Sequence, residues 1–203
     1  MMKRAFDIFA SFFGLMGLFP ILLVVTVLIK LSSPGGAFFY QTRVGRGGKL
    51  FSIYKFRTMI PEAEQRGDKI TVGNDARITP VGAFLRKTKL DELPQLMNVL
   101  KGDMSIVGPR PEVPEFIAEY PEDVRELILS VRPGITDTAS IEFSDEAGLL
   151  EGKSDPRQAY IDEILPMKAK HYVRYVETQS FTGDLLIILA TLNKVFKQAT
   201  EQG

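Results

Sequence analysis

Residues 8–29, IFASFFGLMGLFPILLVVTVLI, are 22 consecutive positions without a charged side chain. As a straight α-helix, rising about 1.5 Å per residue, this segment would be roughly 33 Å long and could cross the hydrocarbon core of a bilayer. It exceeds the hydrophobic region usual in a signal peptide, and no A-x-A site follows it. The segment therefore predicts lasting membrane attachment rather than a cleaved leader.

Two arrangements in the membrane compete, a spanning helix and a re-entrant one. Pro20 lies near the middle of the segment, where it removes one backbone hydrogen bond and clashes with the carbonyl of Met16, so a bend is expected. Basic residues flank both ends, with Lys3 and Arg4 before and Lys30 after. A spanning helix would place one basic flank outside, against the positive-inside tendency. A helix that bends at Pro20 and returns to the same face satisfies both flanks, and the residues alone leave both arrangements open.

The composition limits the chemistry. A chain of 203 residues with 45% apolar and 25% charged side chains fits one folded domain with a core. The absence of Cys excludes disulfides, thiolate metal sites and cysteine nucleophiles, and a single His excludes a multi-histidine metal site. Any metal must have oxygen ligands, which favours Mg²⁺, or Mn²⁺, over Zn²⁺.

The net charge of zero conceals an uneven distribution. Residues 38–110 carry 13 Lys and Arg against seven Asp and Glu, whereas residues 111–203 carry 9 against 17. A basic middle is what an anionic substrate or an anionic membrane surface would select. Solvated surface charge without a partner is the alternative.

The remaining pattern predicts an α+β fold that is mainly helical, with one short β-hairpin and helices partly at the membrane interface. Residues 38–43 and 50–56 form the hairpin strands around a Gly-rich turn. Thr79-Pro80 opens a helix to Lys87, and Gly102 ends a second helix that starts near Glu92 and has apolar residues at 93, 96, 97 and 100. Further helices are expected at 114–130, 156–177 and 184–198, with loops at 61–78 and 107–114.

The stretch KLDELPQL, residues 89–96, places Asp91 and Glu92 at the start of that second helix. The unpaired N–H groups and the dipole of a helix N-terminus favour negative charge there, so Asp91 could be a capping residue. Alternatively, an ionised carboxylate could attack phosphorus as a covalent nucleophile. Its neighbour Glu92 could then hold Mg²⁺, which would shield the charge of a diphosphate.

The basic middle of the chain supplies candidates for binding such an anion. Arg110 lies between Pro109 and Pro111, and this rigid backbone suits bidentate recognition of phosphate, although an incidental surface arginine would look the same. The other candidates are Lys55, Arg57, Arg77 and Arg86.

Three series of residues resemble one known family. They are YQTRVGRGGKLFSIYKFRTM (40–59), ARITPVGAFLRKTKLDELPQLMNVLKGDMSIVGPRPE (76–112) and VRPGIT (131–136). In order and spacing they are similar to the bacterial sugar transferases called monotopic phosphoglycosyl transferases, in the small form that consists of the catalytic domain. The match covers roughly residues 1–136.

The resemblance implies transfer of a sugar-1-phosphate from a UDP-sugar to a polyprenol phosphate, undecaprenyl phosphate, with release of UMP. It implies that Asp91 is the nucleophile that forms a covalent phosphosugar intermediate and that Glu92 binds Mg²⁺. It assigns phosphate contacts to the cations that stand in these motifs, Lys55, Arg57, Arg86 and Arg110, and it leaves a structural role for Asp103. It also implies a re-entrant helix broken at Pro20.

The expected organisation is a re-entrant membrane helix at 1–30 and a cytoplasmic catalytic domain at 31–203, on the cytoplasmic face of the bacterial inner membrane. Membrane lipids are expected partners and nucleic acid is not. The residues give no indication of an oligomeric state. Sugar selectivity is expected to lie in the segment 137–175.

Two alternatives belong to other classes. A membrane-anchored protein that binds anionic lipid or a partner without catalysis would need the basic residues but not Asp91. A different Mg²⁺-dependent phosphotransfer enzyme would use water as the acceptor.

Overall fold

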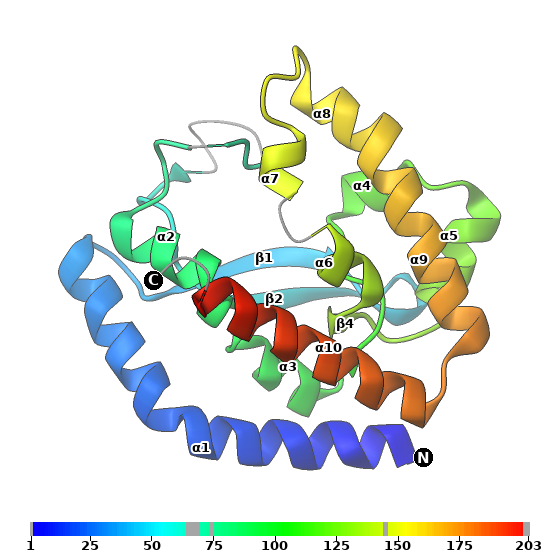
Figure 1. Cartoon of the computed structure of the whole chain (residues 1–203), viewed down its shortest axis with the longest axis horizontal. Helices are drawn as coiled ribbons and strands as arrows, with labels where there is room; N and C mark the ends of the chain where they lie inside the picture. The colour runs from blue at the N-terminus through cyan, green and yellow to red at the C-terminus, as the bar shows by residue number, and fades with distance from the viewer. Residues whose placement is uncertain (1, 64–69, 74, 144–145, 201–203) are drawn as a thin grey trace.

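The computed structural model describes residues 2–63, 70–73, 75–143 and 146–200 (Figure 1). Within these ranges helices predominate, and the strands form two small two-stranded sheets. The predicted class, a mainly helical α+β fold with a short hairpin, is therefore confirmed, and the second sheet is an addition to it. The predicted division at residue 30 stays a prediction.

Helix α1 (Met2–Ser32) runs along one side of the molecule and bends along its length (Figure 1). Pro20 lies inside the helix, and its missing N–H explains a bend without an end to the helix. By length and composition α1 could cross a membrane, and only 11% of its most apolar window is buried within the protein. The predicted apolar helix is confirmed, whereas its path in the membrane stays a prediction.

The predicted hairpin is also confirmed. Strands β1 (Phe38–Val44) and β2 (Leu50–Phe56) pair antiparallel, with Phe38 opposite Phe56 and Val44 opposite Leu50. The 3₁₀ turn η1 (Arg46–Gly48) joins them, and Gly47 has a φ of 67°, which a residue without a side chain adopts at little cost. Ile53 and Phe56 face inward and are almost fully buried.

Helix α2 (Pro80–Lys87) begins as expected, because the Thr79 hydroxyl accepts a hydrogen bond from the Gly82 amide at 2.9 Å. The predicted helix start near Glu92 is wrong. Residues Leu90–Glu92 form a separate 3₁₀ turn, η3, and α3 (Gln95–Lys101) begins only after Pro94, which has no N–H to continue the turn. Gly102 ends α3 in the left-handed conformation, as predicted.

Two three-residue strands join distant motifs. Strand β3 (Ser105–Val107) pairs in parallel with β4 (Gly134–Thr136). At the end of this pair, Gly108 and Gly134 approach so closely that a Cβ on Gly134 would lie 2.1 Å from the Gly108 amide nitrogen. The Gly134 amide also donates to Pro109 O at 2.9 Å. These contacts fix the start of the 108–113 loop, which carries Arg110.

The C-terminal half is a layer of helices. The helix predicted at 114–130 is two helices, α4 (Pro114–Ala118) and α5 (Glu122–Leu129), because Pro121 interrupts it. The next are α6 (Thr138–Glu142) and α7 (Glu146–Leu149), neither of which was predicted. The helix predicted at 156–177 is α8 (Pro156–Ala159), the π-helical segment η4 (Tyr160–Ile164) and α9 (Leu165–Thr178).

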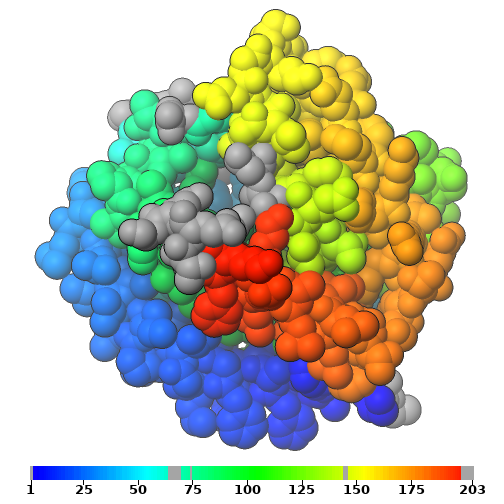
Figure 2. Space-filling view, viewed as in Figure 1, coloured from blue at the N-terminus to red at the C-terminus, as the bar shows by residue number. Residues whose placement is uncertain are grey.

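Helix α10 (Phe181–Thr200) contains the segment predicted at 184–198. In the space-filling view it lies over the centre of one face, beside α1 (Figure 2). Among the described residues, the largest apolar cluster joins α4, α5 and α9 and includes Phe116, Ile128 and Tyr172. Part of the predicted loop 61–78 lies outside the described residues.

Candidate active site

A cavity of about 870 Å³ lies between the hairpin, the turn η3, the 108–113 loop and the helices α6, α7, α9 and α10. Seven of the residues predicted from sequence line it, although they come from four separate segments of the chain. They are Lys55, Arg57, Arg77, Arg86, Asp91, Glu92 and Arg110. The fold therefore gathers the predicted acids and cations around one space large enough for a nucleotide-sized ligand.

Asp91 is a buried carboxylate at the wall of this cavity, 8% exposed. None of the described residues donates a hydrogen bond to its Oδ1 atom. The turn that carries it has no side-chain cap, so the interpretation of Asp91 as a helix cap is wrong. Burial, and then the charge of Glu92, raise the pKa of Asp91 to about 6, against the opposing effect of Lys55.

The backbone before Asp91 takes an unusual conformation. Lys89 has a φ of 57°, in the left-handed region that a residue with a side chain seldom occupies. This turns the chain from the end of α2 directly into η3. The strained position thus directs the acid pair toward the cavity.

Glu92 is held by two cations. Lys55 Nζ lies 2.9 Å from its Oε1 atom, and Arg110 donates to both oxygens, to Oε2 at 3.2 Å. Burial would raise the pKa of Glu92, but the charges of Arg110 and Lys55 outweigh it and hold the pKa well below its usual value. Glu92 is therefore ionised, whereas no cation among the described residues forms an ion pair with its neighbour Asp91.

The side chain of Asn98 fixes the position of Lys55 relative to Glu92. Its side-chain amide donates to Ser52 O at 2.8 Å and accepts from the Tyr54 amide at 3.0 Å, so α3 is fastened to β2. This places Lys55, the next residue of β2, opposite Glu92. Sequence reasoning missed Asn98, because a polar side chain on a short helix ordinarily faces water.

The apolar stripe predicted for this segment is not the buried face of α3. Gln95, Asn98 and Val99 are buried, whereas Met97 is 43% exposed. Leu96 lies against α1, its Cδ1 atom 3.5 Å from where a Cβ on Gly14 would be. The apolar stripe predicted from sequence is thus divided: Leu93 and Leu96 line the cavity, Leu96 also lies against α1, and Met97 is exposed.

The other predicted cations make contacts within the chain. Arg86 donates to the hydroxyls of Thr58 at 2.9 Å and Thr71 at 3.2 Å. Arg57 donates to Ser33 O at 2.9 Å and to Pro34 O at 2.8 Å, which ties the end of α1 to β2. These bonds hold Arg86 and Arg57 in place at the cavity wall.

Arg77 is paired with Asp75, with an N–O distance of 2.6 Å, and also donates to Ala63 O. The described contacts of these cations thus fix their orientation, and phosphate contacts by them stay a prediction.

The four residues expected to be structural lie outside the cavity lining. Asp103 follows the Gly102 cap of α3, and its amide donates to Asn98 O at 3.1 Å. Pro109 and Pro111 flank Arg110, and their carbonyls accept hydrogen bonds from the Gly134 amide and from Arg43. Pro20 lies within α1.

A second charged group in the cavity wall was not found from sequence. Lys168 lies 2.6 Å from Glu112 Oε1, and the Tyr160 hydroxyl donates to the same oxygen at 3.1 Å. Nothing in the local pattern distinguishes Lys168 from its exposed neighbour Lys170, and Glu112 gave no signal beyond its place after the PRP triplet. Two of these three residues lie in the 137–175 segment expected to set selectivity.

The acid pair is compatible with Mg²⁺ only in combination with a substrate. In the described part of the chain, no group of three or more His, Cys, Asp or Glu side chains is placed to hold a metal ion. Glu92 nevertheless offers a carboxylate at the cavity wall, beside the unpartnered Oδ1 of Asp91. Mg²⁺ sites commonly combine one or two carboxylates with substrate phosphates and water, so these residues fit the ion.

Fold and site together define a membrane-associated protein whose cation-rich cavity ends at a buried acid pair. The family model for bacterial sugar transferases matches residues 1–198. The chain belongs to this family.

Three curated relatives show the range within it. The exopolysaccharide production protein PSS of Rhizobium leguminosarum bv. phaseoli is 40% identical over 94% of this chain and 93% of its own length. The UDP-N-acetylgalactosamine-undecaprenyl-phosphate N-acetylgalactosaminephosphotransferase of Aeromonas hydrophila is 38% identical, and the UDP-glucose:undecaprenyl-phosphate glucose-1-phosphate transferase of Escherichia coli (strain K12) is 36% identical. These matches cover 95% and 97% of this chain, but only 43% and 40% of the two longer relatives.

Proposed function

We propose that this protein transfers a sugar-1-phosphate from a UDP-sugar to undecaprenyl phosphate or a similar polyprenol phosphate and releases UMP. The observation that carries the proposal is the buried, unpartnered Oδ1 of Asp91 in a cavity lined with cations. The names of the Aeromonas and E. coli relatives, which specify a UDP-sugar and undecaprenyl phosphate, support this class of donor and acceptor.

The first step is attack by a carboxylate oxygen of Asp91 on the phosphorus that bears the sugar. A P–O bond of the diphosphate breaks, UMP leaves with the electron pair, and the sugar phosphate remains on Asp91 as an acyl phosphate. Arg110, Lys55 and Arg86 carry positive charge at the cavity wall, where they can stabilise the charge that develops on the phosphate oxygens. A carboxylate with few hydrogen bonds is a stronger nucleophile than a solvated one.

In the second step, an oxygen of the lipid phosphate attacks the same phosphorus. The bond to Asp91 breaks, and the product is a polyprenol diphosphate sugar. Glu92 would hold Mg²⁺, which would supply neutralisation of the charge on the phosphate groups. Glu92 keeps its own charge because Lys55 and Arg110 hold it ionised.

We further propose that α1 is re-entrant, because both of its ends are fastened to the same body. Near its start, Arg4 donates to Val99 O at 2.7 Å and Asp7 accepts from the Ile106 amide at 3.1 Å. Near its end, Val25 and Ile29 are buried in a cluster with residues of β2 and α2. A straight spanning helix would carry one end away from this body.

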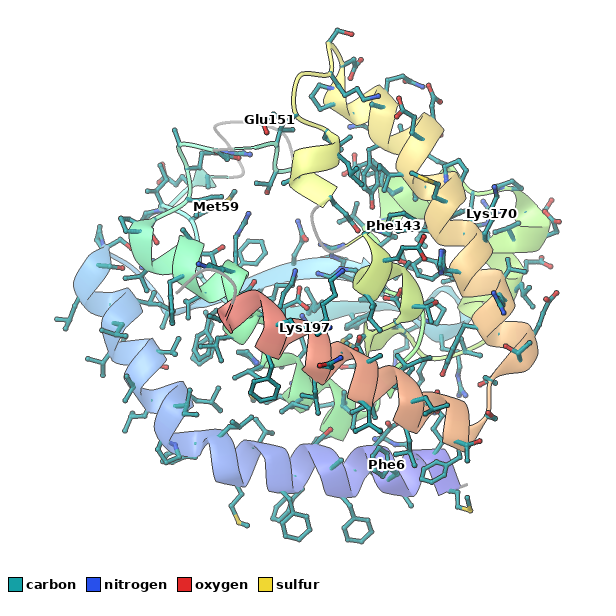
Figure 3. All side chains as sticks on the ribbon, in the orientation of Figure 1. Phe6, Met59, Phe143, Glu151, Lys170 and Lys197 are labelled. Carbon is teal, nitrogen blue, oxygen red and sulfur yellow. The ribbon has the colours of Figure 1, made fainter. Side chains whose placement is uncertain are left out.

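The side of α1 that faces away from the body is apolar. Aromatic side chains project outward from it (Figure 3), and Phe9, Phe12 and Phe19 are each more than half exposed. Such a surface is suited to lipid and costly in water. The bacterial inner membrane and its cytoplasmic face, where UDP-sugars occur, form part of the same proposal.

The test is UMP release from a panel of UDP-sugars in nanodiscs with Mg²⁺, with and without undecaprenyl phosphate. We expect lipid-dependent turnover by the wild type and none by Asp91→Asn. Without undecaprenyl phosphate, the wild type should release at most one molecule of UMP per protein molecule. A phosphosugar adduct on Asp91 should then be detectable by mass spectrometry. Turnover that survives in Asp91→Asn would overturn the covalent role.

A further inference from the structure

Lys168 on α9 is a buried cation, 2% exposed, that the proposed reaction does not use. A lysine ammonium has three hydrogens to donate. Here they have three acceptors: Glu112 Oε1 at 2.6 Å, the Tyr160 hydroxyl at 2.9 Å and Glu146 Oε1 at 3.2 Å. These contacts occupy the ammonium group within the cavity wall, so its role concerns its neighbours rather than a ligand.

The most important neighbour is Glu112, two residues after Arg110 in the same loop. The backbone of this loop is fixed from β1, where the Val44 amide donates to Glu112 O at 3.1 Å and Arg43 donates to Pro111 O at 2.9 Å. The side chain of Glu112 instead points into the cluster with Lys168. Two carboxylates, Glu92 and Glu112, therefore lie near the loop that carries Arg110. Among the described contacts, Arg110 bonds only Glu92.

The local helix geometry supports a dedicated contact. In a regular α-helix, residues eight positions apart are about 80° apart around the axis. The π-helical segment η4 begins at Tyr160 and adds a residue to the turn, so Tyr160 and Lys168 come onto one side. Both then reach Glu112 Oε1. Such segments are rare and frequent at functional sites.

We propose that Lys168 is a positioning residue that neutralises Glu112 and thereby keeps Arg110 bonded to Glu92. Without Lys168, Glu112 would lose its closest cation and, among the described residues, keep only the weaker pair with Arg43, whose Nη1 atom lies 3.9 Å from Glu112 Oε2 and also donates to Pro111 O. The attraction of Glu112 for Arg110, two residues away in the same loop, would then increase. Arg110 would then leave Glu92, and the charge arrangement beside Asp91 would be lost. This inference rests on the proposed sugar-phosphate transfer.

The experiment measures kcat and KM for UMP release with the UDP-sugar that the wild type turns over fastest. Lys168→Met keeps the length of the side chain and removes its charge. We expect it to lower kcat by about 100-fold, the effect of a small displacement of catalytic groups, with KM changed less than about threefold. The double variant Lys168→Met/Glu112→Gln removes both charges and should recover kcat to within about tenfold of the wild type, because neutral replacement of a buried pair is tolerated.

A matched control uses the other carboxylate of Lys168. The side chain of Glu146 is 34% exposed, whereas that of Glu112 is 5% exposed, so water can solvate a freed charge on Glu146. Lys168→Met/Glu146→Gln should therefore stay as slow as Lys168→Met alone. Equal recovery in both double variants, or recovery in neither, would overturn the positioning role.

Folding is checked by thermal unfolding of each variant. If Lys168→Met does not fold, Glu112→Gln alone decides: it should lose less than about tenfold in kcat, because Arg110 keeps Glu92. A greater loss would contradict the proposal. An inactive wild type would instead refute the proposed transfer reaction, and wild-type rates in Lys168→Met would refute only the role of Lys168.

Discussion

Lys55 and Glu92 form an ion pair of 2.9 Å between β2 and the turn η3, across 37 residues of sequence. The two residues lie on different secondary-structure elements. The pair therefore depends on Asn98, which fastens α3 to the hairpin. Arg110 approaches the same carboxylate from a third segment. The site is thus held together by one carboxylate shared between two cations.

Replacement of this carboxylate should affect both stability and activity. Glu92→Gln leaves Lys55 and Arg110 side by side without an anion. Breaking a buried ion pair on one side typically costs about 3–5 kcal/mol, and the partial exposure of Arg110 places the expected loss at the lower end, about 3 kcal/mol. Urea unfolding measures it, with the exposed Glu122→Gln as control. A loss equal to that of the control would show that the pair is not important for the fold.

Asp91 should be a destabilising residue at neutral pH. Its pKa is raised to about 6 from 3.8 because burial disfavours the ionised form. A shift of about two units corresponds to at most about 3 kcal/mol. Asp91→Asn should therefore raise the thermal unfolding temperature at pH 8 although it abolishes turnover. At pH 4, where the buried acid is protonated, the difference between the two proteins should nearly disappear.

The same raised pKa predicts the acid limb of activity. The attacking group is the ionised carboxylate, which predominates above pH 6 and is lost as pH falls below it. The value of kcat/KM should fall about tenfold per pH unit below that point, since this quantity reports the free enzyme. A pH profile of UMP release measures it. A limb near pH 4 would mean that Asp91 titrates as an ordinary surface acid.

The chain has no cysteine, so single cysteines can report the path of α1. Met2→Cys and Gly36→Cys mark its two ends, and Lys49→Cys marks the hairpin turn. In sealed vesicles, a membrane-impermeant maleimide should label all three from the same side. Labelling of positions 2 and 36 from opposite sides would identify a spanning helix and contradict the re-entrant path.

Gly134→Ala should damage the site from a distance. An added Cβ would lie 2.1 Å from the Gly108 amide nitrogen, and both groups are backbone, so β4 or the 108–113 loop must shift. We expect a loss of stability of about 1–3 kcal/mol from this overpacking, and slower UMP release because Arg110 follows Gly108. Gly36→Ala, whose nearest contact would be at 3.9 Å, serves as control. Wild-type activity in Gly134→Ala would show that the loop tolerates displacement.

Much of the fold could be predicted because it depends on local signals. Glycines in the turn indicated the hairpin. A capping threonine followed by proline indicated the start of α2, and a long apolar run indicated α1. The short strands β3 and β4 could not be predicted, since three residues carry no periodicity and the pair joins segments far apart in the chain. The helix expected from Glu92 was wrong because Pro94 separates a 3₁₀ turn from α3.

The site was predicted at its motif residues and not beyond them. Asp91, Glu92, Lys55 and Arg110 stand in motifs that resemble a family, and they do meet at one cavity. The motif gave no hint that Arg57 bonds the end of α1 or that Arg77 pairs with Asp75. Lys168 was missed for a general reason: a buried lysine differs from an exposed one only through partners that tertiary folding supplies.

The contacts at the start of α1 have a consequence for biosynthesis. Arg4 bonds carbonyls of residues 99 and 100, and Lys3 bonds Asp184. A ribosome makes these partners after α1, so the start of α1 cannot be fastened to the body until the chain has been synthesised as far as residue 184. The attachment of α1 to the body is therefore completed only when α10, which carries Asp184, has been synthesised.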